Sequence, residues 1–355
     1  MLPPTYVPDF HDADVISKMP YRSLGKTGMQ VSILSFGASS LGSVFRKTTL
    51  EESIEVVHTA VKAGINLIDT APWYGHGKSE TVLGHCLKDI PRQAYYLNTK
   101  VGRYLPEVSD TFDFSAERTI ASVHESIQRL GVEYLDCVQV HDPEFSCSLD
   151  VILKETLPAL QICKDLGLIK FVGITGYPLN AQLYLLKHST VHIDTSLTYC
   201  HYSLNDRTLM DSFLPYLEEK GVGCINASPI SMGLLSHRGP PEWHPASTKI
   251  KQVCAEAAKY CEERNVNISR IAICFTLSNE RLPTTLVSTA SVDRMRSNIE
   301  AVYTPLNEQE TKVKDELLQN IFSKLQGEET WIGNEVSDYW DLRQEKWKEL
   351  AKKKK

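Results

Sequence analysis

The chain has 355 residues, enough for one large domain or two ordinary ones with a sizeable buried core. Hydrophobic residues make up 42% and charged residues 23%, which is the balance of a soluble globular protein. The net charge of -6 argues against a nucleic-acid-binding face, because the only run of basic residues is the lysine stretch 352–355 at the very end. We interpret that run as a solvated tail rather than a targeting signal or a site for an anionic partner.

No apolar run approaches the length of a membrane span, and the first residues lack the apolar segment of a signal peptide. The nine cysteines form no C-x-x-C pair and no grouping with histidine that suits a metal. We therefore expect a cytoplasmic protein with mostly buried free thiols, no metal, no nucleic-acid or membrane partner, and a monomeric or weakly oligomeric state.

The predicted elements begin with an extended arm at 1–20 and a hairpin at 21–31, with glycine at its turn. From residue 33 to about 301, short apolar runs alternate with amphipathic helical patterns. Strands are predicted at 33–36, 66–68, 95–99, 135–140, 171–174, 192–197, 223–226 and 285–288. Helices are predicted at 50–63, 79–88, 115–130, 150–166, 179–188, 205–220, 248–264, 268–278 and 292–301, and another at about 308–326 before an aromatic-rich tail.

Strands that are apolar on both faces indicate a parallel sheet covered by helices. Eight strand–helix units fit a closed (β/α)8 TIM barrel better than an open doubly wound sheet. No G-x-G-x-x-G follows the first strand, since the glycines of 37–42 have the wrong spacing. The predicted α/β chain thus comprises an arm (1–20), a barrel that includes the N-terminal hairpin (21–302), and a C-terminal helical tail (303–355) that packs on or over the barrel.

Polar residues end three consecutive predicted strands. Asp69, Lys100 and His141 stand at these ends, and Tyr74 follows Asp69 on a loop rich in glycine and proline. Because the chemistry of such a barrel lies at the C-terminal ends of its strands, these four side chains are expected to meet at one rim. Each residue alone has an ordinary structural interpretation; their convergence is what indicates a site.

The four residue types suit proton transfer coupled to hydride transfer. Reduction of a carbonyl needs a proton donor whose pKa is close to the working pH. The pKa of a tyrosine is about 10, so neighbouring groups must lower it. A lysine ammonium favours the phenolate, and a carboxylate keeps that lysine charged. We therefore expect Tyr74 to act as acid or base, Lys100 and Asp69 to tune it, and His141 to orient the carbonyl oxygen.

At these residues the chain resembles the aldo-keto reductase family. The motifs are G-I-N-L-I-D-T-A-P-W-Y-G at 64–75, T-K at 99–100, R-L-G-V-E-Y-L-D at 129–136 before V-H at 140–141, and S-V-D-R-M-R-S-N at 291–298. Within the family, the stretches 99–104, 112–115, 199–206 and 225–235 look closest to the L-galactose dehydrogenase-like group, which oxidises an aldose at C1. The resemblance implies a TIM barrel, a catalytic tetrad of Tyr74, Lys100, Asp69 and His141, and a nicotinamide dinucleotide bound without a Rossmann fingerprint.

Carried over to matching positions, the resemblance also implies residues for cofactor and substrate. The expected cofactor residues are Thr175, Tyr199, Ser228, Gly233, Leu234, Ser288, Thr289, Arg294 and Asn298; the expected substrate residues are Trp73, Tyr104, Tyr202 and Trp331. NADP(H) is favoured, because Arg294 matches a position that grips the 2′-phosphate, and NAD(H) is the alternative. The substrate is expected to be a small-molecule carbonyl, an aldose or small aldehyde. Where many members carry Asn, Gln and an aromatic residue, this chain has Gly176, Tyr199 and Ala227.

Three other functions are weighed against this enzyme. A cofactor-binding regulatory or scaffold subunit of the same fold is the main alternative, although the intact tetrad argues against it. A barrel hydrolase using Asp69 and Asp142 would leave Tyr74 and Lys100 without roles. A P-loop ending at 77–79 fails because Pro72 stands where glycine is required. The tail aromatics, including Trp331, Tyr339 and Trp340, either pack the tail onto the barrel or close over a substrate as a lid.

Overall fold

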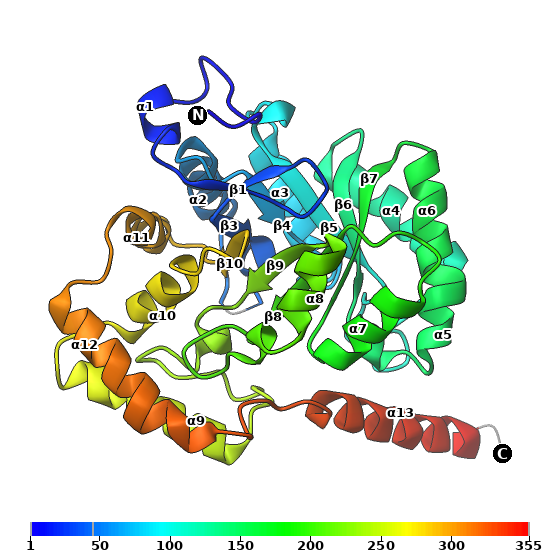
Figure 1. Cartoon of the computed structure of the whole chain (residues 1–355). Helices are drawn as coiled ribbons and strands as arrows, with labels where there is room; N and C mark the ends of the chain where they lie inside the picture. The colour runs from blue at the N-terminus through cyan, green and yellow to red at the C-terminus, as the bar shows by residue number, and fades with distance from the viewer. Residues whose placement is uncertain (1, 45, 354–355) are drawn as a thin grey trace.

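The computed structural model describes residues 2–44 and 46–353, and it contains the predicted barrel. Eight parallel strands close in the order β10-β3-β4-β5-β6-β7-β8-β9, with helices around them (Figure 1). The strands are β3 (Leu34–Gly37), β4 (Leu67–Asp69), β5 (Tyr96–Val101), β6 (Leu135–His141), β7 (Ile169–Gly176), β8 (Thr195–Tyr199), β9 (Gly223–Ala227) and β10 (Thr284–Ser288). The (β/α)8 prediction is confirmed, because each predicted strand coincides with or overlaps one of these.

The predicted hairpin is also present and lies at the N-terminal end of the barrel. Its strands are β1 (Tyr21–Ser23) and β2 (Gln30–Ser32), paired antiparallel. Leu24, Met29 and Val31 are buried with strand residues Leu67 and Leu286 in one apolar cluster. The hairpin therefore covers the end of the barrel opposite to the expected chemistry.

The surrounding helices are short. They are α2 (Leu50–Lys62), α3 (Lys78–Leu87), α4 (Ala116–Leu130), α6 (Leu157–Asp165), α7 (Leu179–His188), α8 (Phe213–Lys220), α9 (Thr248–Glu262), α10 (Ile268–Leu277), α11 (Val292–Tyr303) and α12 (Glu308–Glu316), with a helical turn α5 (Leu149–Val151) leading into α6. Several of them, among them α2, α4 and α11, are capped by a side chain at the N-terminus. In α2, the Thr49 side chain accepts a hydrogen bond from the Glu52 backbone and the Glu52 side chain accepts one from the Thr49 backbone. Such reciprocal capping satisfies donors that the first turn leaves free, so it fixes where the helix begins.

The structure differs from the predicted elements in three places. Residues 205–212 are not part of α8, which begins at Phe213, and they contain a short 3-10 helix at Thr208–Met210. The Asp206 side chain holds this turn by accepting hydrogen bonds from the backbone and the hydroxyl of Thr208. The arm at 1–20 contains one helical turn, α1 (Ala13–Ile16), capped by Asp12. The tail contains a long helix, α13 (Asn334–Lys353), that the sequence analysis left without structure. Of the C-terminal lysines, Lys354 and Lys355 lie outside the described residues.

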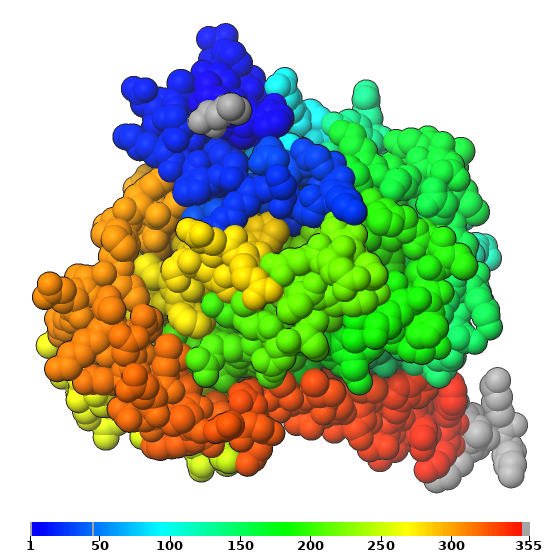
Figure 2. Space-filling model, in the orientation of Figure 1, coloured from blue at the N-terminus to red at the C-terminus, as the bar shows by residue number. Residues whose placement is uncertain are grey.

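The C-terminal segment packs against the barrel at the C-terminal ends of its strands. Tyr339 of α13 contacts Phe112 and Phe145 edge-on, with ring centroids 5.2 and 5.5 Å apart, and these two residues follow β5 and β6. Trp331 stacks on Tyr177, which follows β7, at 4.5 Å. Figure 2 shows the orange and red segment as a continuous strip along one edge of the body. The tail thus covers part of the mouth, by which we mean the rim formed by the C-terminal strand ends. No helix among the described residues is long and apolar enough to cross a membrane.

Candidate active site

The four predicted catalytic side chains come from three neighbouring strands and one loop. Asp69 ends β4, Lys100 lies in β5, His141 ends β6, and Tyr74 stands between β4 and α3. The Lys100 ammonium is 1% exposed and donates hydrogen bonds to the Asp69 carboxylate, to the Thr70 carbonyl at 2.8 Å and to the Tyr74 hydroxyl at 3.4 Å. Three of the four groups are therefore directly connected, with lysine at the centre.

Gln139 completes the support of the carboxylate. Its Nε2 donates to the second oxygen of Asp69 at 2.9 Å, so both oxygens of Asp69 have a donor. Gln139 was not among the site residues predicted from the sequence. A signal for it existed: Gln139 lies two positions before His141 in the same strand, and alternate residues of a strand point to the same side.

The charges of the site favour an ammonium beside a neutral phenol. Burial opposes the charged form of Lys100, but the Asp69 carboxylate and the Tyr74 hydroxyl together raise its pKa above the usual value. Burial raises the pKa of Tyr74, and the Lys100 charge acts in the opposite direction. The site is thus arranged so that the lysine selectively stabilises the phenolate when a proton leaves.

His141 faces the tyrosine, and its burial favours the neutral imidazole. The two rings are edge-to-face, with centroids 6.0 Å apart. Burial, followed by the charges of Lys100 and Arg103, lowers the pKa of His141 well below its usual value. Its Nε2 lies 3.5 Å from Asp142 Oδ2, which also accepts a hydrogen bond from Arg103 Nη1 at 2.6 Å. A neutral imidazole can orient a carbonyl or hydroxyl oxygen without adding charge to it.

The loop that carries Tyr74 is fixed from two sides. A side chain at Gly42 would place its Cβ 2.5 Å from the Tyr74 carbonyl oxygen, so glycine is required there. Behind the loop, Glu80 is fully buried and accepts hydrogen bonds from Thr99 Oγ1 at 2.5 Å and from Arg129 Nε at 2.7 Å. This pair gives Arg129 a physical role: it neutralises a carboxylate buried in the first turn of α3, the helix that follows the Tyr74 loop.

Replacing Arg129 by alanine should destabilise the protein, because it leaves the Glu80 carboxylate buried without its counter-ion. We expect a loss of about 3–5 kcal/mol in the free energy of unfolding and a Tm lower by about 5–10 °C, measured by thermal denaturation. The double variant Arg129→Ala/Glu80→Gln should recover part of the loss, because the buried charge is gone. A Tm within about 2 °C of the wild type for Arg129→Ala would contradict this role.

The predicted substrate residues fall into two groups. Trp73 lies at the mouth, with the Arg103 guanidinium 4.1 Å from its ring centroid, and Trp331 is buried against Tyr177. Tyr104 instead faces α4: Arg118 lies 4.1 Å over its ring, and its hydroxyl accepts a hydrogen bond from the Gly102 backbone. Tyr202 stacks on Phe275 of α10 at 5.2 Å. The structure therefore does not bring Tyr104 or Tyr202 together with the tetrad.

The predicted cofactor residues lie on β7 to β10 and the turns and helix that follow them. Thr175 is the penultimate residue of β7 and pairs with His141, and Tyr199 ends β8. In the turn after β9, Ser228, Ser231, Met232 and Gly233 all have positive φ values, of 58°, 47°, 51° and 104°, and Leu234 directly after them is buried. Three non-glycine residues in this strained conformation within one turn are typical of a functional loop.

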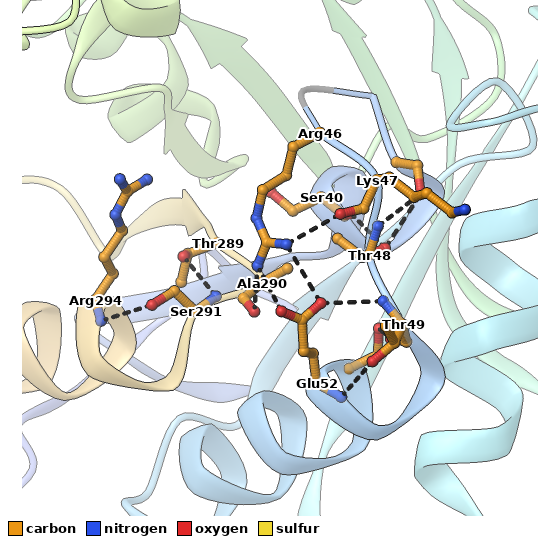
Figure 3. Close-up of polar contacts among 12 residues, drawn as sticks. Ser40, Arg46, Lys47, Thr48, Thr49, Glu52, Thr289, Ala290, Ser291 and Arg294 are labelled. Carbon is orange, nitrogen blue, oxygen red and sulfur yellow. Dashed lines mark hydrogen bonds and ion pairs between the residues drawn. The ribbon is translucent and has the colours of Figure 1, made fainter.

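The remaining cofactor candidates lie at the end of β10 and in α11, and Figure 3 shows two of them, Thr289 and Arg294, at the start of that helix. Thr289 Oγ1 accepts a hydrogen bond from the Ser291 backbone, and Ser291 Oγ caps α11 by accepting one from Arg294 N. Arg294 is exposed, forms no ion pair with any described residue, and extends away from the cap, with Asn298 one turn further along α11. Ser288 accepts hydrogen bonds from Ser39 Oγ at 2.8 Å and from the Ser40 backbone at 3.1 Å. A helix start beside a free guanidinium fits the phosphate groups of a dinucleotide.

The side chain of Arg46 joins two loops beside this region. Arg46 donates hydrogen bonds to the Glu52 carboxylate at 3.2 and 3.3 Å and to the Ala290 carbonyl at 3.2 Å (Figure 3). It therefore connects the loop before α2 to the loop after β10. The sequence analysis did not single out this arginine.

Comparison with known proteins gives consistent results. A model of the aldo/keto reductase family matches residues 33–319. L-Galactose dehydrogenase of Arabidopsis thaliana is 45% identical over 290 residues, which cover 81% of this chain and 89% of the relative. D-Arabinose 1-dehydrogenase of Saccharomyces cerevisiae is 34% identical over 262 residues, covering 70% of this chain and 76% of the relative. The holo form of aldo-keto reductase AKR11C1 from Bacillus halodurans superposes with a TM-score of 0.68 at 28% identity, over 84% of this chain and 96% of its own.

These matches confirm the resemblance found in the motifs, including the one to the L-galactose dehydrogenase-like group. The family model covers most of the chain, and relatives named for three different aldose dehydrogenations are similar to it. The chain belongs to the aldo-keto reductase family and is an oxidoreductase of the kind that works with NAD(P)H.

Proposed function

We propose that the protein is an aldose 1-dehydrogenase, which moves a hydride between C1 of a sugar and NAD(P), with Tyr74 as the acid or base. The observation that carries this proposal is the Lys100 ammonium, which is buried and donates to both Asp69 and the Tyr74 hydroxyl. The two relatives reported above with the higher identities are named for oxidation of L-galactose and D-arabinose, which supports an aldose as substrate.

The side chains would divide the work as follows. When bound, the dinucleotide supplies the hydride acceptor for oxidation and the donor for reduction. Tyr74 takes the proton from the C1 hydroxyl during oxidation and returns it during reduction. Lys100 stabilises the phenolate, while Asp69 and Gln139 hold the ammonium in place. His141 donates a hydrogen bond to the reacting oxygen and so orients C1.

The dinucleotide would be held along β7 to β10. Thr175, Tyr199, Ser228, Gly233, Leu234, Ser288, Thr289, Arg294 and Asn298 are the residues we assign to it. Of these, Arg294 bears on the choice between the two dinucleotides, because it is a free guanidinium at the start of a helix. Residues 21–302 would then form the catalytic unit and residues 303–355 a cover for its substrate side.

The experiment that tests the proposal is a dinucleotide-coupled screen. L-galactose, D-arabinose and small aldehydes are offered with NAD(H) and NADP(H), and the change in absorbance of the reduced nicotinamide is followed. Turnover of an aldose supports the proposal. A protein that binds a dinucleotide but turns over no carbonyl or sugar would favour the regulatory alternative instead.

Replacing Arg294 by alanine should weaken binding of NADPH by about 10-fold or more and that of NADH by less than about 3-fold. Only NADPH carries the 2′-phosphate that a guanidinium can pair with. Dissociation constants from the quenching of protein fluorescence provide the measurement, with Arg296→Ala on the same helix as the control. Equal losses for both dinucleotides would remove Arg294 from the 2′-phosphate site.

A further inference from the structure

Several buried polar side-chain atoms lack a hydrogen-bond partner among the described residues, and His141 Nδ1 at the mouth is one of them. Three more lie beside it in one cluster: Arg103 Nε, Asp142 Oδ1 and Glu144 Oε2, which are linked by the Arg103–Asp142 ion pair and by the charges that Asp142 and Arg103 exert on Glu144. Buried polar atoms in folded proteins are nearly always paired, because an unpaired one loses its hydration without compensation. Three unpaired atoms in one place therefore indicate a site whose partner comes from outside the chain.

The other atoms of the same side chains are firmly held. Asp142 is 1% exposed, and its Oδ2 accepts a hydrogen bond from Arg103 Nη1 at 2.6 Å. Glu144 Oε1 accepts one from the Tyr177 backbone at 2.9 Å. Each carboxylate is thus fixed through one oxygen, and its other oxygen is buried without a hydrogen-bond partner among the described residues.

The backbone is shaped to present these groups at the rim of the barrel. Asp142 has a left-handed backbone, with φ 52° and ψ 57°, a conformation that costs free energy in a residue other than glycine and that clusters at functional sites. A Cβ built on Gly176, at the end of β7, would lie 2.5 Å from Glu144 Oε2. The absence of a side chain at 176 therefore makes room for this carboxylate next to the strand end.

The cluster lies directly beside the catalytic groups. Asp142 follows His141, and its Oδ2 lies 3.5 Å from His141 Nε2. Arg103 stands over Trp73 at 4.1 Å, and it also lies 5.3 Å from the ring centroid of Phe112. Burial and then the charge of Asp142 raise the pKa of Glu335 at the start of α13, whereas the charge of Arg103 acts in the opposite direction, so Glu335 lies near both groups. The cluster thus lies between the tetrad and the covering tail, where the part of a substrate next to the reacting carbon would lie.

We propose that Asp142 and Glu144 form a hydroxyl-recognition subsite, in which Oδ1 and Oε2 accept hydrogen bonds from two hydroxyl groups of the substrate and Arg103 Nε donates to one of these hydroxyls. Sugar hydroxyls both donate and accept, so a carboxylate next to a guanidinium matches them. The subsite selects polyhydroxylated substrates over plain aldehydes of the same size. This inference rests on the proposed function and adds to it the groups that read the sugar.

The test combines substitutions in the protein with deletions in the substrate. In Asp142→Asn the amide oxygen keeps the hydrogen bond from Arg103, and in Glu144→Gln it keeps the one from the Tyr177 backbone. The amide nitrogen then takes the position of the unpaired oxygen, so each substitution turns an acceptor into a donor. The kcat/KM is measured for the best aldose from the screen and for its analogues that each lack one hydroxyl. Each variant should lower kcat/KM for the parent aldose by about 10–100-fold. For the analogue that lacks the partner hydroxyl, the loss should be less than about 3-fold.

Asp136→Asn is the matched control. Asp136 is another buried carboxylate of β6, and it pairs with Arg92 at 2.6 Å at the opposite end of the barrel. Any decrease in kcat/KM for Asp136→Asn should therefore be the same for the parent aldose and for its deoxy analogues. Dinucleotide binding, measured by fluorescence quenching, shows whether each variant is folded. If Asp142→Asn does not fold, Glu144→Gln provides the test.

The outcomes separate this inference from the proposed function. Equal losses for the parent and all deoxy analogues, or no loss for the parent, would overturn the subsite, since ordered water would then account for the unpaired atoms. Wild-type turnover confined to aldehydes without hydroxyls would also overturn it while leaving hydride transfer intact. A wild type that transfers hydride to or from none of the compounds would defeat the proposed function, and the subsite with it.

Discussion

Replacing Tyr74 by phenylalanine is expected to lower kcat by about 10²–10⁴-fold in both directions of the reaction. Phenylalanine keeps the ring that packs edge-to-face with His141 but removes the hydroxyl to which Lys100 donates a hydrogen bond. Dinucleotide affinity should change by less than about 2-fold, because the hydroxyl is assigned to proton transfer and not to cofactor binding. The measurements are steady-state kinetics in both directions and fluorescence titration with the dinucleotide.

Tyr96→Phe is the control for this substitution. Tyr96 begins β5 at the opposite end of the barrel, so its variant should stay within about 3-fold of the wild-type kcat. If Tyr74→Phe retained a tenth or more of the wild-type kcat, the tyrosine would not be the proton-transfer group, and the mechanism proposed here would be wrong.

Replacing Lys100 by methionine should lower kcat near neutral pH by about 10²-fold or more and should shift the pH profile of oxidation. The ammonium favours the phenolate and so lowers the pKa of Tyr74 against the effect of burial, and its removal raises that pKa. Oxidation needs tyrosine as a base, so its rate should rise with pH in the wild type and should rise only at a higher pH in the variant. Reduction needs the neutral phenol, so its rate should stay flat until the same pKa is reached. Profiles of kcat against pH in each direction measure the shift.

The same variant leaves Asp69, which is 3% exposed, without its counter-ion. We expect a stability loss of about 3–5 kcal/mol that Asp69→Asn in the double variant partly reverses, without recovery of activity. Lys78→Met is the control, since Lys78 is an exposed lysine just after the Tyr74 loop that contacts Ser43 Oγ at 2.7 Å. Lys100→Met with an unshifted pH profile would show that the lysine does not tune the tyrosine.

The sequence predicted the barrel and the convergence of Asp69, Tyr74, Lys100 and His141, the proposed catalytic groups, because both follow from local pattern. Apolar runs with polar ends locate the strands, and parallel strands bring Asp69, Lys100 and His141 to the same rim without further information. The identity of the contacts was predicted less well. Whether Lys100 would reach Tyr74, and that Gln139 would hold Asp69, depends on side-chain directions that only the closed sheet fixes.

The positions of side chains in the loops and the tail were the hardest to predict from the sequence. Tyr104 and Tyr202 have the residue type and the chain position of substrate contacts, yet their rings pack on Arg118 and Phe275, because the loops that carry them turn toward the helices. The pairing of Arg103 with Asp142 joins loops after different strands, and no local pattern announces it. Helix α13 was missed because its charged residues obscure a short apolar stripe, of which Tyr339 is the buried member.

The proposed proton-transfer groups and the proposed substrate-recognition groups lie in different parts of this molecule. Asp69, Lys100 and His141 belong to three adjacent strands joined by backbone hydrogen bonds, whereas Arg103, Glu144 and Glu335 stand outside the sheet. Under the proposed function, exchange of the loops that carry Arg103 and Glu144, or of the tail, is therefore expected to alter substrate choice while Tyr74 and the three strand residues stay in place. Such a division would let relatives named for L-galactose and for D-arabinose differ in substrate and still keep the proposed proton-transfer groups.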